Sequence, residues 1–78
     1  MTIKEQIITN HFNPVHPEYT FFVNAKNYGV EPIEVRMLLE YMEDDGFIYL
    51  SQRTSDVWEV APTQRGQEHF ANLIILIK

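Results

Sequence analysis

Residues 32–50, PIEVRMLLEYMEDDGFIYL, decide the expected fold because they combine a helix pattern with a strand that follows it directly. Pro32 suits the first turn of a helix, and Gly46 suits the residue just after its end. The apolar residues between them recur at the three- and four-residue spacing of one helix face: Val35, Leu38, Leu39 and Met42. The stretch therefore predicts a helix that Pro32 opens and Gly46 closes.

The residues after Gly46 predict a β-hairpin. Phe47–Leu50 and Val57–Val60 are rich in β-branched and aromatic residues, and the polar segment 51–56 joins them. Alternation along the second strand puts Trp58 and Val60 on one face and Glu59 on the other. We therefore expect the Trp58 side to pack on the helices.

The chain before residue 32 predicts two further helices. Thr2 and Glu5 fit a capping box, the apolar side chains of Ile3, Ile7, Ile8 and Phe12 follow at helical spacing, and Asn13-Pro14 ends that helix. Pro17 then opens a second helix that runs to Tyr28, with Gly29 just after its end. Residues 19–23 are rich in β-formers, so a short strand there is the alternative.

A last helix is expected from residue 63 onward, with Thr63 as its N-cap. Its apolar face consists of Phe70, Leu73, Ile74 and Ile77, and we expect these four residues to form a homodimer interface. Residues 73–77 leave no polar face on that helix, and a helix that is apolar all round needs burial against something. A short strand and a membrane-peripheral tail are the alternatives for this segment.

Residues 38–48 and 58–70 resemble winged helix-turn-helix regulators of the MarR and PadR type from bacteria or phages. The resemblance in the first stretch consists of the leucine-rich turn, the acidic pair Asp44-Asp45, Gly46 and two apolar residues. In the second stretch it consists of Thr63-Gln64-Arg65-Gly66 before the closing helix. The resemblance implies a mostly α fold with a β-hairpin (α+β), in which residues 1–78 form one domain. Its parts would be a three-helix core, a wing and a C-terminal helix.

The same resemblance implies a transcriptional regulator that binds double-stranded DNA as a homodimer. In such proteins the first half of the recognition helix and the wing tip contact the duplex, which makes Arg36 and Arg53 candidate DNA-binding residues, with Arg65 as a third. The charge pattern argues against DNA binding, because the net charge is −5 and the whole excess of acidic residues lies in residues 31–45. Glu31 and Glu34 stand at the start of the expected recognition helix.

The alternative hypothesis is a winged-helix module that binds protein instead of DNA, as an adaptor or an inhibitor. Ile33 and Met37 lie one turn apart on the expected solvent side of the third helix, next to Glu40. Methionine is enriched in the cores of protein interfaces. These three residues would meet a basic or an apolar surface of a partner protein.

Catalysis and metal binding have little support in the sequence. There is no cysteine, the three histidines (His11, His16 and His69) are scattered along the chain, and no phosphate-cradling glycine loop is present. We therefore expect no enzymatic activity, no cofactor and no metal. The N-terminus lacks the apolar core of a secretory signal, and no apolar run is long enough for a membrane span, so a cytoplasmic protein without membrane contact is expected.

Overall fold

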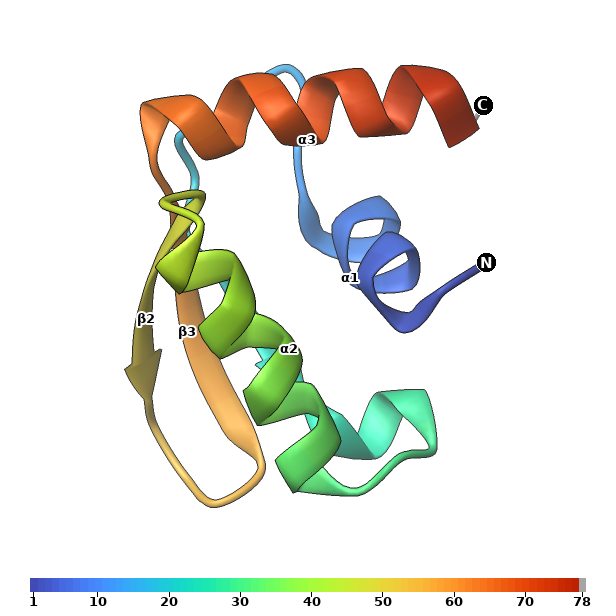
Figure 1. The fold of residues 1–78 in the computed structure, drawn as a ribbon, viewed down its shortest axis with the longest axis vertical. Coiled ribbons are helices and arrows are strands. Elements are labelled where there is room, and N and C mark those ends of the chain that lie inside the picture. The colour runs from blue at the N-terminus through green and yellow to red at the C-terminus, as the bar shows by residue number, and fades with distance from the viewer. Residues whose placement is uncertain (78) are drawn as a thin grey trace.

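Residues 1–77, the part of the chain that the computed structural model describes, fold into three α-helices and a three-stranded antiparallel sheet, an α+β arrangement (Figure 1). The elements in chain order are α1 (Ile3–His11), β1 (Phe21–Asn24), the short 3-10 helix η1 (Ala25–Tyr28), α2 (Pro32–Asp44), β2 (Ile48–Gln52), β3 (Val57–Pro62) and α3 (Gln64–Ile77). The strand order is β1-β3-β2, so the last strand lies in the middle.

Helix α1 begins and ends where the sequence predicts. The Thr2 hydroxyl accepts the backbone N–H of Glu5 at 3.1 Å, and the Glu5 carboxylate accepts the N–H of Thr2 at 2.9 Å. The capping box is therefore present on both sides. The helix ends at His11, ahead of Asn13 and Pro14, as the restriction on residues before proline requires.

The predicted helix over residues 17–28 is wrong, and the alternative of a strand near residues 19–23 is close to the structure. Strand β1 occupies Phe21–Asn24 and pairs antiparallel with β3, with Phe21 opposite Val60 and Val23 opposite Trp58. Only residues 25–28 are helical, in a single 3-10 turn that Gly29 ends at φ 66°. The β-forming residues of this segment pair with β3, which lies far along the chain. A local sequence pattern cannot reveal such a pairing.

The hairpin and its orientation are confirmed. Trp58 is only 1% exposed, and Val60 on the same face is fully buried, whereas Glu59 lies on the opposite, outer face. All three helices pack on the inner face, and most of the core forms there: Ile7, Ile8, Phe12, Phe21, Val23, Val35, Leu39, Met42, Ile48, Trp58, Val60, Phe70 and Ile74. The outer face of the sheet carries no helix (Figure 1).

Helix α3 crosses one end of the molecule, above α1 and the start of β2 (Figure 1). The Thr63 hydroxyl accepts the N–H of Gly66 at 3.0 Å, which confirms Thr63 as the N-cap, and it donates to the carbonyl of Gly46 at 2.6 Å. The backbone N–H of Thr63 also donates to the Phe47 carbonyl at 2.9 Å. The start of α3 is thereby fixed to the segment that follows α2.

Candidate interaction surface on α2 and the hairpin

The exposed side of α2 carries an apolar stripe. Val35, Leu39 and Met42 face the core, so the residues half a turn away face solvent. Ile33, Met37 and Tyr41 follow one another at four-residue spacing and are 46%, 47% and 62% exposed. The stripe thus contains the two apolar residues that the sequence singled out, and the third, Glu40, lines the groove described next. Tyr41 was missed, although its position four residues after Met37 was the signal that could have found it.

A groove of about 340 Å³ runs beside this stripe, between α2 and β2. Its lining consists of Arg36, Glu40, Glu43, Asp44, Leu50, Gln52 and Trp58. A smaller hollow of about 90 Å³ adjoins it near Ile33 and Ser55 and shares part of that lining. The groove therefore extends from the end of α2 to its first turn, where the hairpin tip lies.

The groove is acidic, and the only cation among the residues described in its lining is already paired. The Arg36 guanidinium lies 3.5 Å from the Glu40 carboxylate, one turn along the helix. The Glu43 carboxylate accepts the backbone N–H of Leu50, on the free edge of β2, at 2.9 Å. Asp44 has no ion-pair partner within residues 1–77. Three carboxylates thus face one guanidinium in this groove.

The three arginines predicted to contact DNA have different contacts. Arg53 pairs with Glu59 at 2.7 Å, and Glu59 belongs to the outer face of the sheet, away from α2. Arg65 lies at the start of α3 with its guanidinium 5.1 Å from the centre of the Phe47 ring. Arg36 is therefore the only one of the three that lines the groove beside α2.

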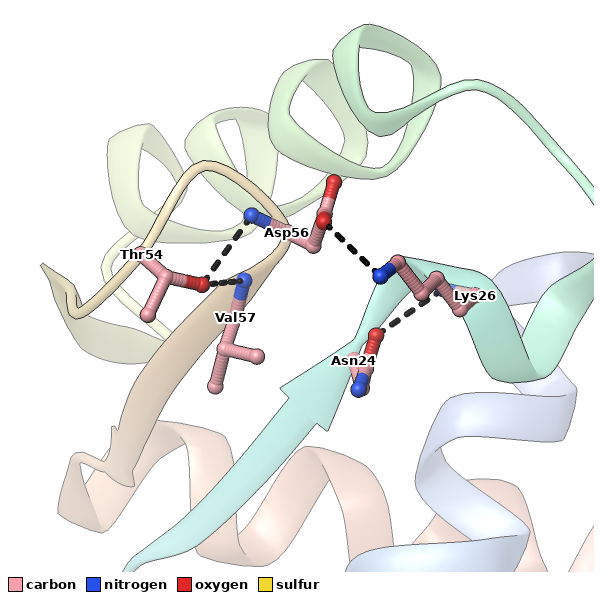
Figure 2. A network of polar contacts seen from close by, with 5 residues as sticks. All are labelled: Asn24, Lys26, Thr54, Asp56 and Val57. Carbon is pink, nitrogen blue, oxygen red and sulfur yellow. Dashed lines mark hydrogen bonds and ion pairs between the residues drawn. The ribbon is translucent and has the colours of Figure 1, made fainter.

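The hairpin tip is anchored to the rest of the fold. The Thr54 hydroxyl accepts the N–H groups of Asp56 and Val57 at 3.2 and 3.1 Å, and the Asp56 carboxylate lies 3.6 Å from the ammonium of Lys26 (Figure 2). The carbonyl of Asp56 also accepts the N–H of Ala25 at 2.9 Å. These contacts hold the tip against the start of η1, so it is a positioned loop beside α2.

The predicted dimer interface on α3 needs a correction. Phe70 is fully buried and Ile74 is 8% exposed, because both point into the chain's own core, so neither is available on the surface of one copy. Leu73 and Ile77 are partly buried. The exposed apolar side chains at this end are Ile75, at 73%, and Leu76, at 83%. The face of α3 that would meet another molecule is thus rotated from the predicted one.

The three histidines lie in separate surroundings. Nε2 of His11 and the hydroxyl of Tyr28 are hydrogen bonded at 2.7 Å, and burial lowers the pKa of this imidazole. His16 stacks on Tyr19 at the surface, with 4.6 Å between ring centres. His69 stacks on Phe47 at 4.2 Å, far from the other two in the sequence. Residues 1–77 contain no group of three histidine or carboxylate side chains arranged to hold a metal ion.

Two further observations bear on the class of protein. None of the helices within residues 1–77 combines the length and the hydropathy that crossing a bilayer requires. Comparison of the chain with protein-family models, with curated proteins and with solved structures finds no match in any of the three.

Proposed function

We propose that this chain is a non-catalytic winged-helix module that binds a partner protein through the exposed face of α2. The chain order of helix, strand, helical turn, helix and hairpin supports the winged-helix assignment. The single turn η1 stands where the sequence predicts a full second helix. The apolar stripe of Ile33, Met37 and Tyr41 carries the functional part of the proposal. Apolar and aromatic side chains at the centre of a contact contribute most of the binding energy in protein interfaces.

The charges beside the stripe indicate the kind of partner. Glu43 and Asp44 leave the groove negative even after Arg36 and Glu40 neutralise each other. A partner that presents an apolar centre with lysine or arginine at its rim would complement both features. The proposed ligand is therefore a basic, partly apolar protein surface.

The same charges oppose duplex DNA at this surface. One carboxylate within about 6 Å of a phosphate costs about 1–3 kcal/mol at effective dielectric constants between 80 and 20. Glu40, Glu43 and Asp44 all line the groove that a duplex contacting both α2 and the hairpin would approach. Arg36 offsets only one of these three carboxylates, so the repulsion from two of them remains.

Sequence-reading of duplex DNA by a homodimeric regulator is the second candidate function. The observation in its favour is the arrangement itself, in which an exposed helix lies beside a hairpin whose tip reaches the first turn of that helix. Two copies would join through Ile75 and Leu76 at the end of α3. Arg36 and Arg53 would then supply the contacts to the duplex, after leaving their present carboxylate partners.

One pair of tyrosines separates the two functions. Tyr41 on α2 and Tyr49 on β2 are both strongly exposed, at 62% and 69%, but only Tyr41 belongs to the apolar stripe. For a partner recovered by cross-linking and purified, Tyr41→Ala and Met37→Ala should each weaken binding by about tenfold or more, as truncation of an interface anchor does. The matched control Tyr49→Ala should bind as the wild type does.

A titration of the protein with random duplex DNA tests the second candidate function. It is done at about 50 mM salt, where attraction to phosphate is strong. The protein-binding proposal expects no measurable affinity. A duplex affinity that falls steeply with added salt and is reduced by Arg36→Ala would refute it and support the regulator.

A further inference from the structure

A second cluster of side chains lies just beyond the C-terminal end of α2, around the ring of Phe47. Lys4 from α1 and both Arg65 and His69 from α3 surround this ring. The His69 imidazole stacks on it at 4.2 Å between centres with planes 2° apart, while the Arg65 guanidinium lies 5.1 Å and the Lys4 ammonium 5.8 Å from its centre. Residues from both ends of the chain thus meet at one aromatic side chain.

The cations of this cluster differ from the other basic residues of the described chain. Lys26, Arg36 and Arg53 each lie within 4.0 Å of a carboxylate, as the ion pairs above show. Lys4 and Arg65 have no carboxylate at that distance among residues 1–77. Among residues 1–77, the two basic side chains that have no carboxylate within 4.0 Å are therefore found together.

The hydrogen bond between Lys4 and His69 fixes the tautomer of the imidazole. Nζ of Lys4 lies 3.2 Å from Nε2 of His69, and an ammonium group can only donate, so Nε2 accepts. The imidazole is then neutral and carries its proton on Nδ1. Within the described residues no acceptor is hydrogen bonded to that Nδ1–H. The cluster thus presents an ammonium and a guanidinium fork, whereas the Nδ1–H of His69 points away from Lys4.

The scaffold beneath the cluster is fixed. The N–H of Phe47 donates to the Met42 carbonyl at 3.0 Å, and the Phe47 carbonyl accepts from Thr63 at 2.9 Å. Gly66 lies against the same carbonyl so closely that even a methyl group would not fit. Phe47, whose ring lies beside both cations, is therefore anchored to α2 and α3, which reduces the cost of ordering a site.

We infer that Lys4 and Arg65 form a binding site for a phosphate group, either free phosphate or a small phosphate monoester, next to the ring of His69. Phosphate accepts several charge-assisted hydrogen bonds at once, and a guanidinium fork matches its oxygens. Asp45 is the nearby acid that opposes the anion. The pKa of His69 is lowered mainly by burial and to a smaller extent by the charges of Lys4 and Arg65. The carboxylate of Asp45 raises it. A bound dianion would raise that pKa, since it favours the imidazolium form.

The test is a titration of the full chain with inorganic phosphate and, separately, with O-phosphoserine, followed by the NMR signals of the His69 ring. Sodium chloride at matched ionic strength is the reference. The expected result is a saturable shift in the millimolar range for at least one of the two probes, with a rise in the pKa of His69. Tighter binding of inorganic phosphate would identify the free ion as the ligand, and tighter binding of O-phosphoserine would identify a monoester.

Charge variants give effects of opposite sign. Lys4→Gln and Arg65→Gln should each weaken binding by about tenfold, the value of one charge-assisted hydrogen bond, and Asp45→Asn should tighten it. Lys26→Gln removes a cation that already has a carboxylate partner and is the matched control, with no change expected. The absence of saturation with both probes, or Lys4→Gln and Arg65→Gln proteins that bind phosphate as tightly as the wild type, would overturn the inference. Neither result bears on the α2 surface, because the stripe residues lie outside this cluster.

Discussion

Gly66 is the position where a single methyl group should disturb the fold most clearly. A Cβ atom built on Gly66 would overlap the carbonyl oxygen of Phe47 and lie 2.7 Å from its carbonyl carbon. Carbon atoms in contact are normally about 3.5–4.0 Å apart, so relieving the contact with the carbonyl carbon alone would move α3 by about 1 Å, and the overlap with the oxygen requires more. The atoms in the way belong to the backbone, which cannot rotate aside as a side chain can.

The expected magnitude for Gly66→Ala follows from opposing effects. Alanine favours the helix over glycine by about 1 kcal/mol, which would stabilise α3. Overpacking costs about 1–3 kcal/mol, and the movement also stretches the hydrogen bonds that Thr63 makes to Phe47 and Gly46, each contributing about 1 kcal/mol. The steric effect should win and lower the free energy of unfolding by about 2 kcal/mol. For a domain of this size that corresponds to a decrease of about 8–16 °C in Tm.

Thermal and urea unfolding followed by circular dichroism measure this difference. Glu68→Ala is the matched control, because Glu68 lies in the same helix, is exposed, and changes only the local helix preference. A Gly66→Ala protein as stable as the wild type, or more stable, would refute the close approach of α3 to Phe47.

Four further predictions test other parts of the structure. Trp58→Ala should cost about 3–5 kcal/mol, as aromatic core deletions do, and leave so small a domain largely unfolded by circular dichroism. Thr54→Val removes the acceptor of two N–H groups at the hairpin tip and should lower stability by about 1 kcal/mol in urea unfolding, with faster amide exchange confined to that tip. Burial lowers the pKa of His11 below its ordinary value of 6.5, so the unfolded chain binds the proton more readily. Stability should therefore be complete above that pH and decrease as the pH falls below it, and His11→Phe should flatten the dependence of Tm on pH. If two copies associate through α3, sedimentation should show a concentration-dependent dimer that Leu76→Glu converts to a monomer, whereas a wild-type chain that stays monomeric at high micromolar concentration would count against the homodimer.

Local signals in the sequence were sufficient for several elements of the fold. Thr2 with Glu5, Pro32 with Gly46, and Thr63 each mark a helix boundary through hydrogen bonds or backbone preferences that involve residues close in the chain. The alternation around Trp58 likewise determined which side of β3 faces the helices. These predictions held because neighbouring residues alone decide them.

Features that depend on distant residues could not be predicted in the same way. Strand β1 forms because Val23 finds Trp58 across the sheet, and residues 21–24 alone fit a helix or a strand. The pairing of Arg53 with Glu59 depends on how the hairpin turns, and the contact of Lys4 with His69 joins residues 65 positions apart. The acidic character of the α2 surface was visible in the sequence, but the groove that collects its carboxylates required the helix and β2 to be placed together.

The hydrogen bond from Leu50 to Glu43 has a consequence for how copies of this chain behave at high concentration. Strand β2 is an outer strand, and the N–H groups along such an edge can recruit a strand from another molecule and start aggregation. The Glu43 carboxylate occupies the N–H of Leu50, near the middle of that edge, and an incoming strand would have to displace it and pass a negative charge. Glu43 thus protects an open sheet edge, and its loss should first become evident as poorer solubility.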